Sequence, residues 1–265
     1  MTMSTVEISG DSPTAGFVRF VRNITMNWMG MLIIALIWEL AGQIFQQPWL
    51  PPLSSVLARM VQLFTTGGLS QHLVASLSSL AIGFAIALVV GLVIGVLMGL
   101  FNWIYAALDV YVNAMLFTPG LIFAPILFAI FGLSDATRIS VVVIYAVFII
   151  IINTAAAVRN VDRPLIEMAA SYGANRTTTV FRIVLPDAFP LIIAGLRMGV
   201  GRAVKGMVNG EMFIALIGIG GQAARFGKQF DFMSVWAISV FIMILAVVIN
   251  QVVTWIEKRL TAWVD

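Results

Sequence analysis

Long apolar stretches restrict the fold of this chain more than any other feature of the sequence. Six of them have about the 20 residues that a helix needs to cross a bilayer. They cover roughly 26–45, 73–101, 103–133, 138–158, 189–217 and 235–256. In hydrocarbon the backbone must satisfy its own polar groups, which helices do and irregular chain does not. The sequence therefore predicts an all-α, polytopic membrane protein with six transmembrane helices.

Composition supports a membrane setting and excludes several kinds of site. Hydrophobic residues make up 61 % of the chain and charged residues 10 %, whereas soluble domains carry about 25 % charged residues. We interpret the net charge of +3 as arginines at a membrane rim beside lipid, and expect no nucleic-acid binding. With no cysteine and one histidine, His72, we expect no disulfide and no metal site.

Lys and Arg residues between the spans indicate the orientation, because they concentrate on the cytoplasmic side. An even number of spans places both termini on one side, which carries eight such residues: Arg19, Arg22, Arg159, Arg163, Arg176, Arg182, Lys258 and Arg259. The other side carries four: Arg59, Arg138, Arg225 and Lys228. We therefore expect a cytoplasmic segment over 1–25, a first helix and external connector over 26–71, a transmembrane domain over 72–257 and a cytoplasmic tail over 258–265. The first apolar stretch is expected to stay as a signal anchor.

A polar segment from Asp162 to Asp187, DRPLIEMAASYGANRTTTVFRIVLPD, separates the fourth and fifth stretches. Pro164 suits the first turn of a helix, and Gly173 stands where a helix typically ends in the left-handed conformation. Asn175 can cap a second helix over 176–184, which we expect to stop at Leu185-Pro186. One apolar face of the first helix is formed by Leu165, Met168, Ala169 and Tyr172.

This pattern predicts a cytoplasmic helix–turn–helix. It could pack only on its own bundle as an ordinary connector, or it could offer a surface to a soluble partner.

The spacing in this segment resembles the EAA loop of permease subunits of ABC importers, Glu-Ala-Ala-x3-Gly-x9-Ile-x-Leu-Pro. The matching residues are Glu167, Ala169, Gly173, Ile183, Leu185 and Pro186, and Met168 departs from the usual alanine. Further stretches look like permeases of the sulfonate, taurine and nitrate type. They are 50–56 (LPPLSSV), 72–77 (HLVASL), 83–84, 190–197 (PLIIAGLR), 201–203 and 210–212.

The resemblance implies a function and a set of partners. The chain would be the permease subunit of an ABC importer in the bacterial inner membrane, for a small anionic solute of sulfonate, taurine, nitrate or carboxylate type. A periplasmic solute-binding protein would deliver the solute, and a second permease copy would complete the pathway as a homodimer. A separate ATP-binding cassette ATPase, holding ATP and Mg, would dock through Glu167, Ala169, Gly173, Leu185 and Pro186. This chain itself would bind no cofactor and would not be an enzyme.

Ionisable residues within the fifth stretch are candidates for the solute pathway, because charges inside a membrane are costly and face the bundle interior. They are Arg202, Lys205 and Glu211, with Arg197 nearer the cytoplasmic end. The two inner cations could favour an anion. Alternatively, these cations pair with carboxylates such as Glu39, Asp109 or Glu211 of a second copy and hold the bundle together. For Arg197 and Glu211 a structural or gating role is the preferred interpretation.

Three further features allow two interpretations each. Small residues at every fourth position, Gly83, Ala87, Gly91, Gly95 and Gly99, allow a close helix contact, either within the subunit or between copies. The glycine-rich segment 218–231 is either a flexible external loop or a re-entrant gate. Thr118-Pro119-Gly120 and Pro125 interrupt the third stretch, as a hinge or as a kink.

Two other functional classes fit the sequence less well. A secondary transporter would need inverted repeats and intramembrane acids, and neither is evident in the sequence. A membrane-embedded enzyme or a scaffold would not need the docking segment. The chain also has no Gly-x4-Gly-Lys-Ser/Thr stretch for ATP phosphates.

Overall fold

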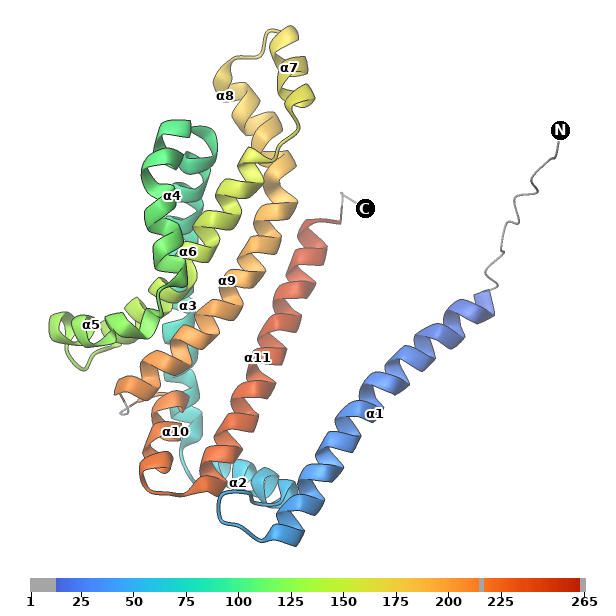
Figure 1. Cartoon of the computed structure of the whole chain (residues 1–265), viewed down its shortest axis with the longest axis vertical. Coiled ribbons are helices and arrows are strands. Elements are labelled where there is room, and N and C mark those ends of the chain that lie inside the picture. The colour runs from blue at the N-terminus through green and yellow to red at the C-terminus, as the bar shows by residue number, and fades with distance from the viewer. Residues whose placement is uncertain (1–12, 215–216, 263–265) are drawn as a thin grey trace.

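The fold is known from a computed structural model, which describes residues 13–214 and 217–262, with the side chains of 13–28 and 214 excepted. Within these ranges every regular element is a helix, as predicted (Figure 1). In chain order these are α1 (Pro13–Phe45), α2 (Leu53–Thr65), α3 (Leu69–Leu100), α4 (Asn102–Phe117), η1 (Gly120–Phe123), α5 (Ala124–Phe131), α6 (Asp135–Arg159), α7 (Arg163–Ser171), α8 (Arg176–Thr179), η2 (Val180–Val184), α9 (Leu185–Ile214), α10 (Ile219–Lys228) and α11 (Phe232–Leu260). Residues 1–12 of the expected N-terminal segment and 263–265 of the expected tail lie outside the described ranges.

Four stretches of helix in the described chain are long and apolar enough to cross a membrane alone: α3, α6, the run from Arg176 to Phe213, and α11. The helices on either side of the Thr118-Pro119 break form a fifth span if they are counted together, although they are bent by 95°. The apolar part of α1 whose side chains are described, Met29–Phe45, is shorter. The expected six spans are compatible with this arrangement if α1 is the first of them.

Helix α6 is the centre of the bundle, with α3 packed along one side and α9 along another. The small residues of α3 face β-branched side chains of α6, in the pairs Gly83–Val142, Gly91–Ile150, Gly95–Thr154 and Gly99–Val158. A Cβ atom added to any of these glycines would lie only 2.5–2.7 Å from a side-chain atom of its partner. The partners keep the same order along both helices, so α3 and α6 run parallel. The stripe of small residues therefore serves packing within the subunit.

The third apolar stretch is broken where the sequence indicated. Helix α4 ends at Phe117, and Thr118 is extended, as expected for a residue before proline. Pro125 lies in the first turn of α5, where a proline disturbs nothing, so it adds no second break. Helix α5 consequently projects sideways from the bundle (Figure 1).

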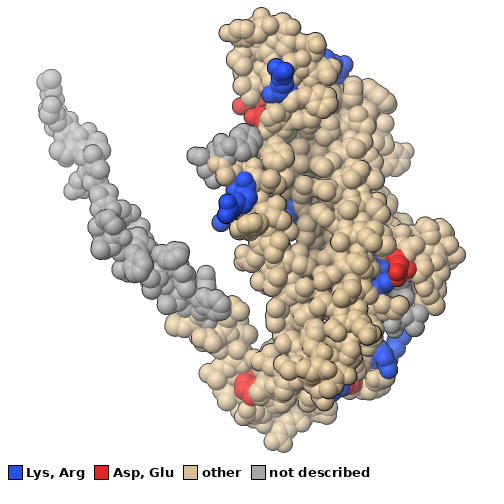
Figure 2. All heavy atoms as spheres, turned by 180° about the vertical axis from the view of Figure 1, so that it is seen from behind, with Lys and Arg blue, Asp and Glu red and all other residues tan. Residues whose placement is uncertain are grey.

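The molecule has two distinct ends. Helices α7 and α8 form one end, and α2 and α10 lie at the other (Figure 1). On the face that Figure 2 presents, charged side chains are few and are separated by wide uncharged areas. Such sparse surface charge is expected of a chain that lies largely in lipid.

Candidate functional site

The end of α7 has the conformation that Gly173 predicted. Gly173 has a φ of +78°, and its N–H donates to the carbonyl of Ala170. The N–H of Ala174 donates to the carbonyl of Ala169. These two hydrogen bonds form the motif in which a left-handed residue closes a helix. A Cβ atom at Gly173 would meet no atom within 4 Å, so glycine is needed here for its backbone conformation and not for space.

The second half of the polar segment begins as predicted but does not end as predicted. Asn175 caps α8, with its side-chain oxygen accepting a hydrogen bond of 2.8 Å from the N–H of Thr178. The expected stop at Leu185-Pro186 is wrong, because the chain widens into the π-helical turn η2 and continues as α9. The N–H of Leu185 donates a hydrogen bond to the carbonyl of Val180. In this wider turn the helix continues through Pro186, although proline has no N–H to donate.

Most of the apolar face predicted for α7 is exposed. Of its members only Ala169 is buried, whereas Met168 is 50 % exposed and Tyr172 is 88 % exposed. Phe181, which lies on η2 in the same loop, is 66 % exposed. A connector that packed only on its own bundle would bury such side chains, so this surface has the properties of a docking site.

The loop is firmly attached to the bundle behind this surface. The guanidinium of Arg159 lies 4.1 Å from the ring centre of Tyr105 and donates a hydrogen bond of 3.0 Å to Asn102. Arg176 lies over the ring of Phe101 at 5.0 Å. Beneath the loop, a separate apolar cluster joins the ends of α6 and α9 through Val158, Val184 and Ala188, among others. The loop and the start of α9 are therefore joined by packing.

The cations of α9 have different surroundings. Arg197 forms an ion pair of 3.1 Å with Glu257 of α11. Arg202 and Lys205 are exposed and form no ion pair with any described residue. The carboxylates once considered as their partners are engaged elsewhere, since Glu39 accepts from Ser54 and Asp109 accepts from Asn113.

Two cavities flank this face of α9. Arg202 lines one of about 190 Å³, beside the broken segment at Thr118-Pro119. Lys205 lines another of about 440 Å³, between α9 and α11. Tyr145 borders both, and its hydroxyl accepts a hydrogen bond of 3.0 Å from Asn209. Cations without acidic partners beside cavities can attract an anion.

Glu211 occupies a different environment from these two cations. Its side chain is fully buried, one carboxylate oxygen lies 3.9 Å from the guanidinium of Arg138, and the other accepts from the N–H of Gly220 at 3.1 Å. Arg138, which was counted only as an external charge, is thus a buried partner from the start of α6. This arrangement agrees with a structural or gating role for Glu211.

The segment 218–231 is not a flexible loop, because 219–228 forms α10 and its first five residues are buried. Side chains from α3 hold its beginning. The N–H of Ile219 donates to Ser76 at 2.9 Å, the N–H of Gly218 donates to His72 at 3.2 Å, and the ring of His72 also pairs with Gln222 at 3.0 Å. The single histidine is therefore a structural residue at an interface between helices.

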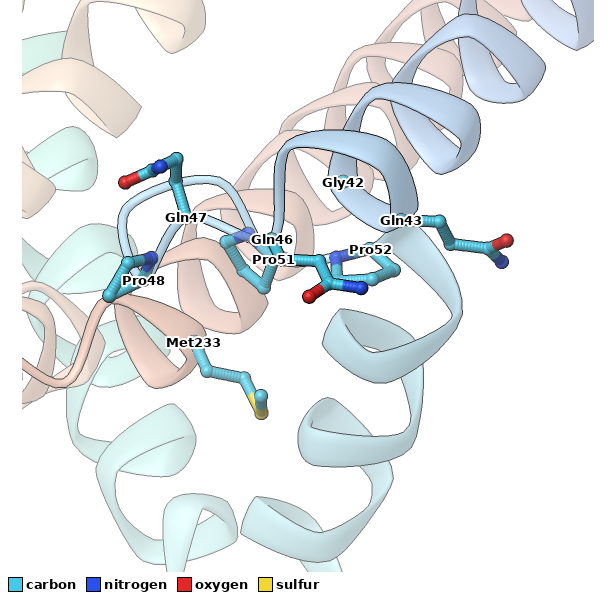
Figure 3. Close-up of a pocket in the computed structure, with 8 residues that line it drawn as sticks. All are labelled: Gly42, Gln43, Gln46, Gln47, Pro48, Pro51, Pro52 and Met233. Carbon is cyan, nitrogen blue, oxygen red and sulfur yellow. The ribbon is translucent and has the colours of Figure 1, made fainter.

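A further cavity, of about 590 Å³, lies elsewhere. Figure 3 shows it at the end of α1, lined by Gly42, Gln43, Gln46, Gln47, Pro48, Pro51, Pro52 and Met233. It touches none of the residues predicted for a site. Within the described ranges no cluster of three or more His, Asp or Glu side chains could hold a metal ion.

Comparison with known proteins decides the family. Residues 87–262 match the family of inner membrane components of binding-protein-dependent transport systems. This chain belongs to that family. It is the membrane-spanning permease subunit of an ABC importer, and it works in an inner membrane with an ATPase subunit and a solute-binding protein.

Curated relatives of the permease span most of its length. It is 35 % identical over 195 residues to a protein of Escherichia coli named as an aliphatic sulfonates transport permease, covering 73 % of this chain and 74 % of the relative. It is 31 % identical over 235 residues to a riboflavin transport system permease of Chloroflexus aurantiacus, covering 88 % of each. It is 26 % identical over 249 residues to the taurine transport system permease of Escherichia coli, covering 91 % and 90 %.

Solved structures support the fold of the permease. A methionine ABC transporter in an inward-facing conformation matches with a TM-score of 0.61 at 18 % identity, over 72 % of this chain and 93 % of that one. An amino acid ABC transporter also matches with a TM-score of 0.61 at 18 % identity, over 77 % and 98 %.

Proposed function

We propose that two copies of this permease enclose a pathway for a small sulfonate-type anion, and that the α7–α8 loop couples the pathway to an ATPase. The observation that carries the proposal is continuity. The helix that carries the exposed Phe181 is continuous from Arg176 to Phe213, and its α9 part presents Arg202 and Lys205. Since α9 has 30 residues, it extends about 45 Å at 1.5 Å per residue, enough to link one membrane face to the other.

Residues of the motif have separate roles in the proposed joint. Gly173 gives the tight turn, and the buried Ala169 gives the close contact between α7 and the second half of the loop. Leu185 and Pro186 form the junction through which movement enters α9, and Glu167 is exposed for contact with the ATPase. ATP and Mg belong to the ATPase, and this chain needs no cofactor.

The orientation follows from this coupling. We infer that the end with α7 and α8 is cytoplasmic, because a cytoplasmic ATPase must reach it. Both termini are then cytoplasmic, and α2 and α10 face the periplasm. The excess of Lys and Arg counted on the side of the loop supports the same orientation.

The anionic solute is supported by two independent observations. Two relatives are named for aliphatic sulfonates and for taurine, and both kinds of molecule carry a sulfonate group. The exposed face of α9 carries two cations without acidic partners, next to cavities that Tyr145 borders. The riboflavin relative shows that the family name alone would not select this class. A homodimer would repeat these cations on both sides of the pathway.

Uptake measurements test the proposal. Cells that depend on this permease should accumulate labelled taurine or ethanesulfonate, and Arg202→Gln should lower the rate about tenfold or more if an ion contact is lost. Lys205→Met tests the second cation in the same assay. Lys258→Gln, which removes an exposed cation in the last turn of α11, is the matched control and should leave the rate within twofold. Normal uptake in both α9 variants would remove these residues from the pathway, and uptake of neutral analogues at the same rate would contradict the anionic class.

A further inference from the structure

The turn between α10 and α11 holds an aromatic residue in an unfavourable conformation. Phe230 has a φ of +57°. Its N–H donates to Gly227, and the N–H of Asp231 donates to Phe226. These are the same two bonds that close α7 around Gly173. In α7 the left-handed position is a glycine, whereas in α10 it is a bulky side chain, for which this conformation is rare.

The side chain of Phe230 makes few contacts that could offset this unfavourable backbone conformation. It is 76 % exposed, and its described ring contact is an edge-on approach to Phe232 at 6.2 Å between centroids. Strained residues persist where the conformation serves a function. Here the conformation leaves an aromatic ring exposed directly after α10, and α10 lies at the end of the molecule opposite to α7 and α8 (Figure 1).

The surface around Phe230 is basic. Arg225 and Lys228, in the last turn of α10, are exposed and form no ion pair with any described residue. The adjacent acid, Asp231, is partly exposed but already paired, since it accepts hydrogen bonds from Ser234 at 2.6 Å and from Arg59 at 3.4 Å. The exposed patch is therefore an aromatic ring and an arginine, residue types that are enriched at protein interfaces, beside a lysine, and neither cation pairs with an acid in the part of the chain that the structure describes.

Helix α10 is a rigid support for this patch. Its beginning is fixed by bonds from Ser76 and His72 of α3 and from Glu211 of α9, as described above. A Cβ atom at Gly220 would lie 2.5 Å from the carbonyl of Val208, so α10 rests directly on the backbone of α9. A binding surface held in this way loses little freedom when it binds.

We propose that Phe230, Arg225 and Lys228 form a contact for the solute-binding protein, and that they meet a carboxylate-bearing rim around an apolar pocket on that protein. The proposal rests on the proposed function, which places α10 in the periplasm. The existence of such a partner follows from the family, which is binding-protein-dependent. Two unpaired cations select an acidic surface, and the exposed ring supplies an anchor. Because the patch is joined to α9, contact there would be sensed by the helix that leads to the coupling loop.

Photocrosslinking in intact cells locates the contact. A benzoylphenylalanine at position 230 should give an adduct containing the solute-binding protein, identified by mass spectrometry. The same group at Phe45, another exposed aromatic at this end, should not. At Phe181, on the opposite end, it should capture the ATPase. Adducts with lipid alone at position 230 would mean that the patch touches membrane headgroups, and would overturn the proposal. If position 181 also failed to capture the ATPase, the proposed function itself would fail.

A substitution separates docking from folding. Phe230→Gly relieves the left-handed strain, so the melting temperature of the purified transporter should be unchanged or higher. Its affinity for the captured binding protein should fall about tenfold, the usual loss when an interface anchor is removed. Arg225→Gln with Lys228→Gln should slow association and weaken its dependence on salt. A lower melting temperature together with unchanged affinity would show that Phe230 serves only the fold.

Discussion

Glu211 is the residue whose surroundings differ most from those that its neighbours in the sequence suggest. The sequence places it in an apolar stretch and offers three cations of the same helix as partners. The structure instead pairs it with Arg138, more than 70 positions earlier in the chain. No local pattern contains this contact, because it depends on the packing of α6 against α9. By contrast, the conformation of Gly173 and the cap at Asn175 depend only on adjacent residues, and both were predicted.

Removal of the Glu211 carboxylate is expected to destabilise the permease. Glu211→Ala removes the buried partner of Arg138 and leaves only its ion pair with the exposed Asp135. Breaking a buried pair costs up to about 3–5 kcal/mol. The melting temperature in detergent should therefore fall sharply. The double variant Arg138→Met with Glu211→Met should recover much of the loss, since no charge is left unpaired. If Glu211→Ala were as stable as the wild type, the Arg138–Glu211 pair would not contribute to the stability of the fold.

A second effect at this scale depends on pH. Partial burial raises the pKa of Asp231, but the hydrogen bonds from Ser234 and the charge of Arg59 outweigh it and hold that pKa below its usual value. A lowered pKa in the folded state stabilises the fold above the ordinary aspartate pKa of about 3.9, and this stabilisation is lost as the pH falls through the folded value. Asp231→Asn should thus lower the melting temperature at neutral pH, and the difference should shrink below about pH 4. A difference that stays constant with pH would contradict this account.

At the scale of elements, helices with a local sequence signal were predicted well, whereas those that depend on contacts with distant parts of the chain were not. The apolar length of α3, α6 and α11 fixes them as helices, and the Thr118-Pro119 break follows from the geometry of proline. The existence of α10 was missed, because five of its residues are glycines or charged residues and its start is held by His72, Ser76 and Glu211 from other helices. The continuation of η2 into α9 was missed because a π-helical turn has no clear signal in sequence.

The parallel contact between α3 and α6 can be tested with two alanine substitutions of opposite sign. At Gly91 an added Cβ atom would lie 2.6 Å from Ile150, so Gly91→Ala should destabilise the fold by about 1–3 kcal/mol through overpacking. Gly201, in α9, has no atom within 4 Å of such a Cβ, so Gly201→Ala should be neutral or stabilise by up to about 1 kcal/mol. Thermal denaturation of both proteins measures the difference. Equal effects would mean that the two helices are not in close contact at Gly91.

For the whole molecule, the arrangement places the exposed loop surface, which we propose as the docking site, at one end, the anchored helix α10 at the other and α9 between them. The class of fold, the family and the position of the loop could be read from the sequence, because apolar length and motif spacing are properties of the chain alone. The internal contacts could not be predicted, since the Arg138–Glu211 pair and the hydrogen bonds that hold α10 form only when distant helices meet.

The most direct test of the central claim is purification of tagged permease from native membranes in mild detergent, with its partners identified by mass spectrometry. Gly173→Asp places a side chain at a left-handed position inside the loop. Gly68→Asp does the same at a left-handed position outside it, where an added Cβ atom also meets nothing within 4 Å. The account predicts that the ATPase accompanies the wild type and the Gly68→Asp variant but is lost from Gly173→Asp. Retention of the ATPase by Gly173→Asp, or its absence from the wild type, would contradict the loop as the joint.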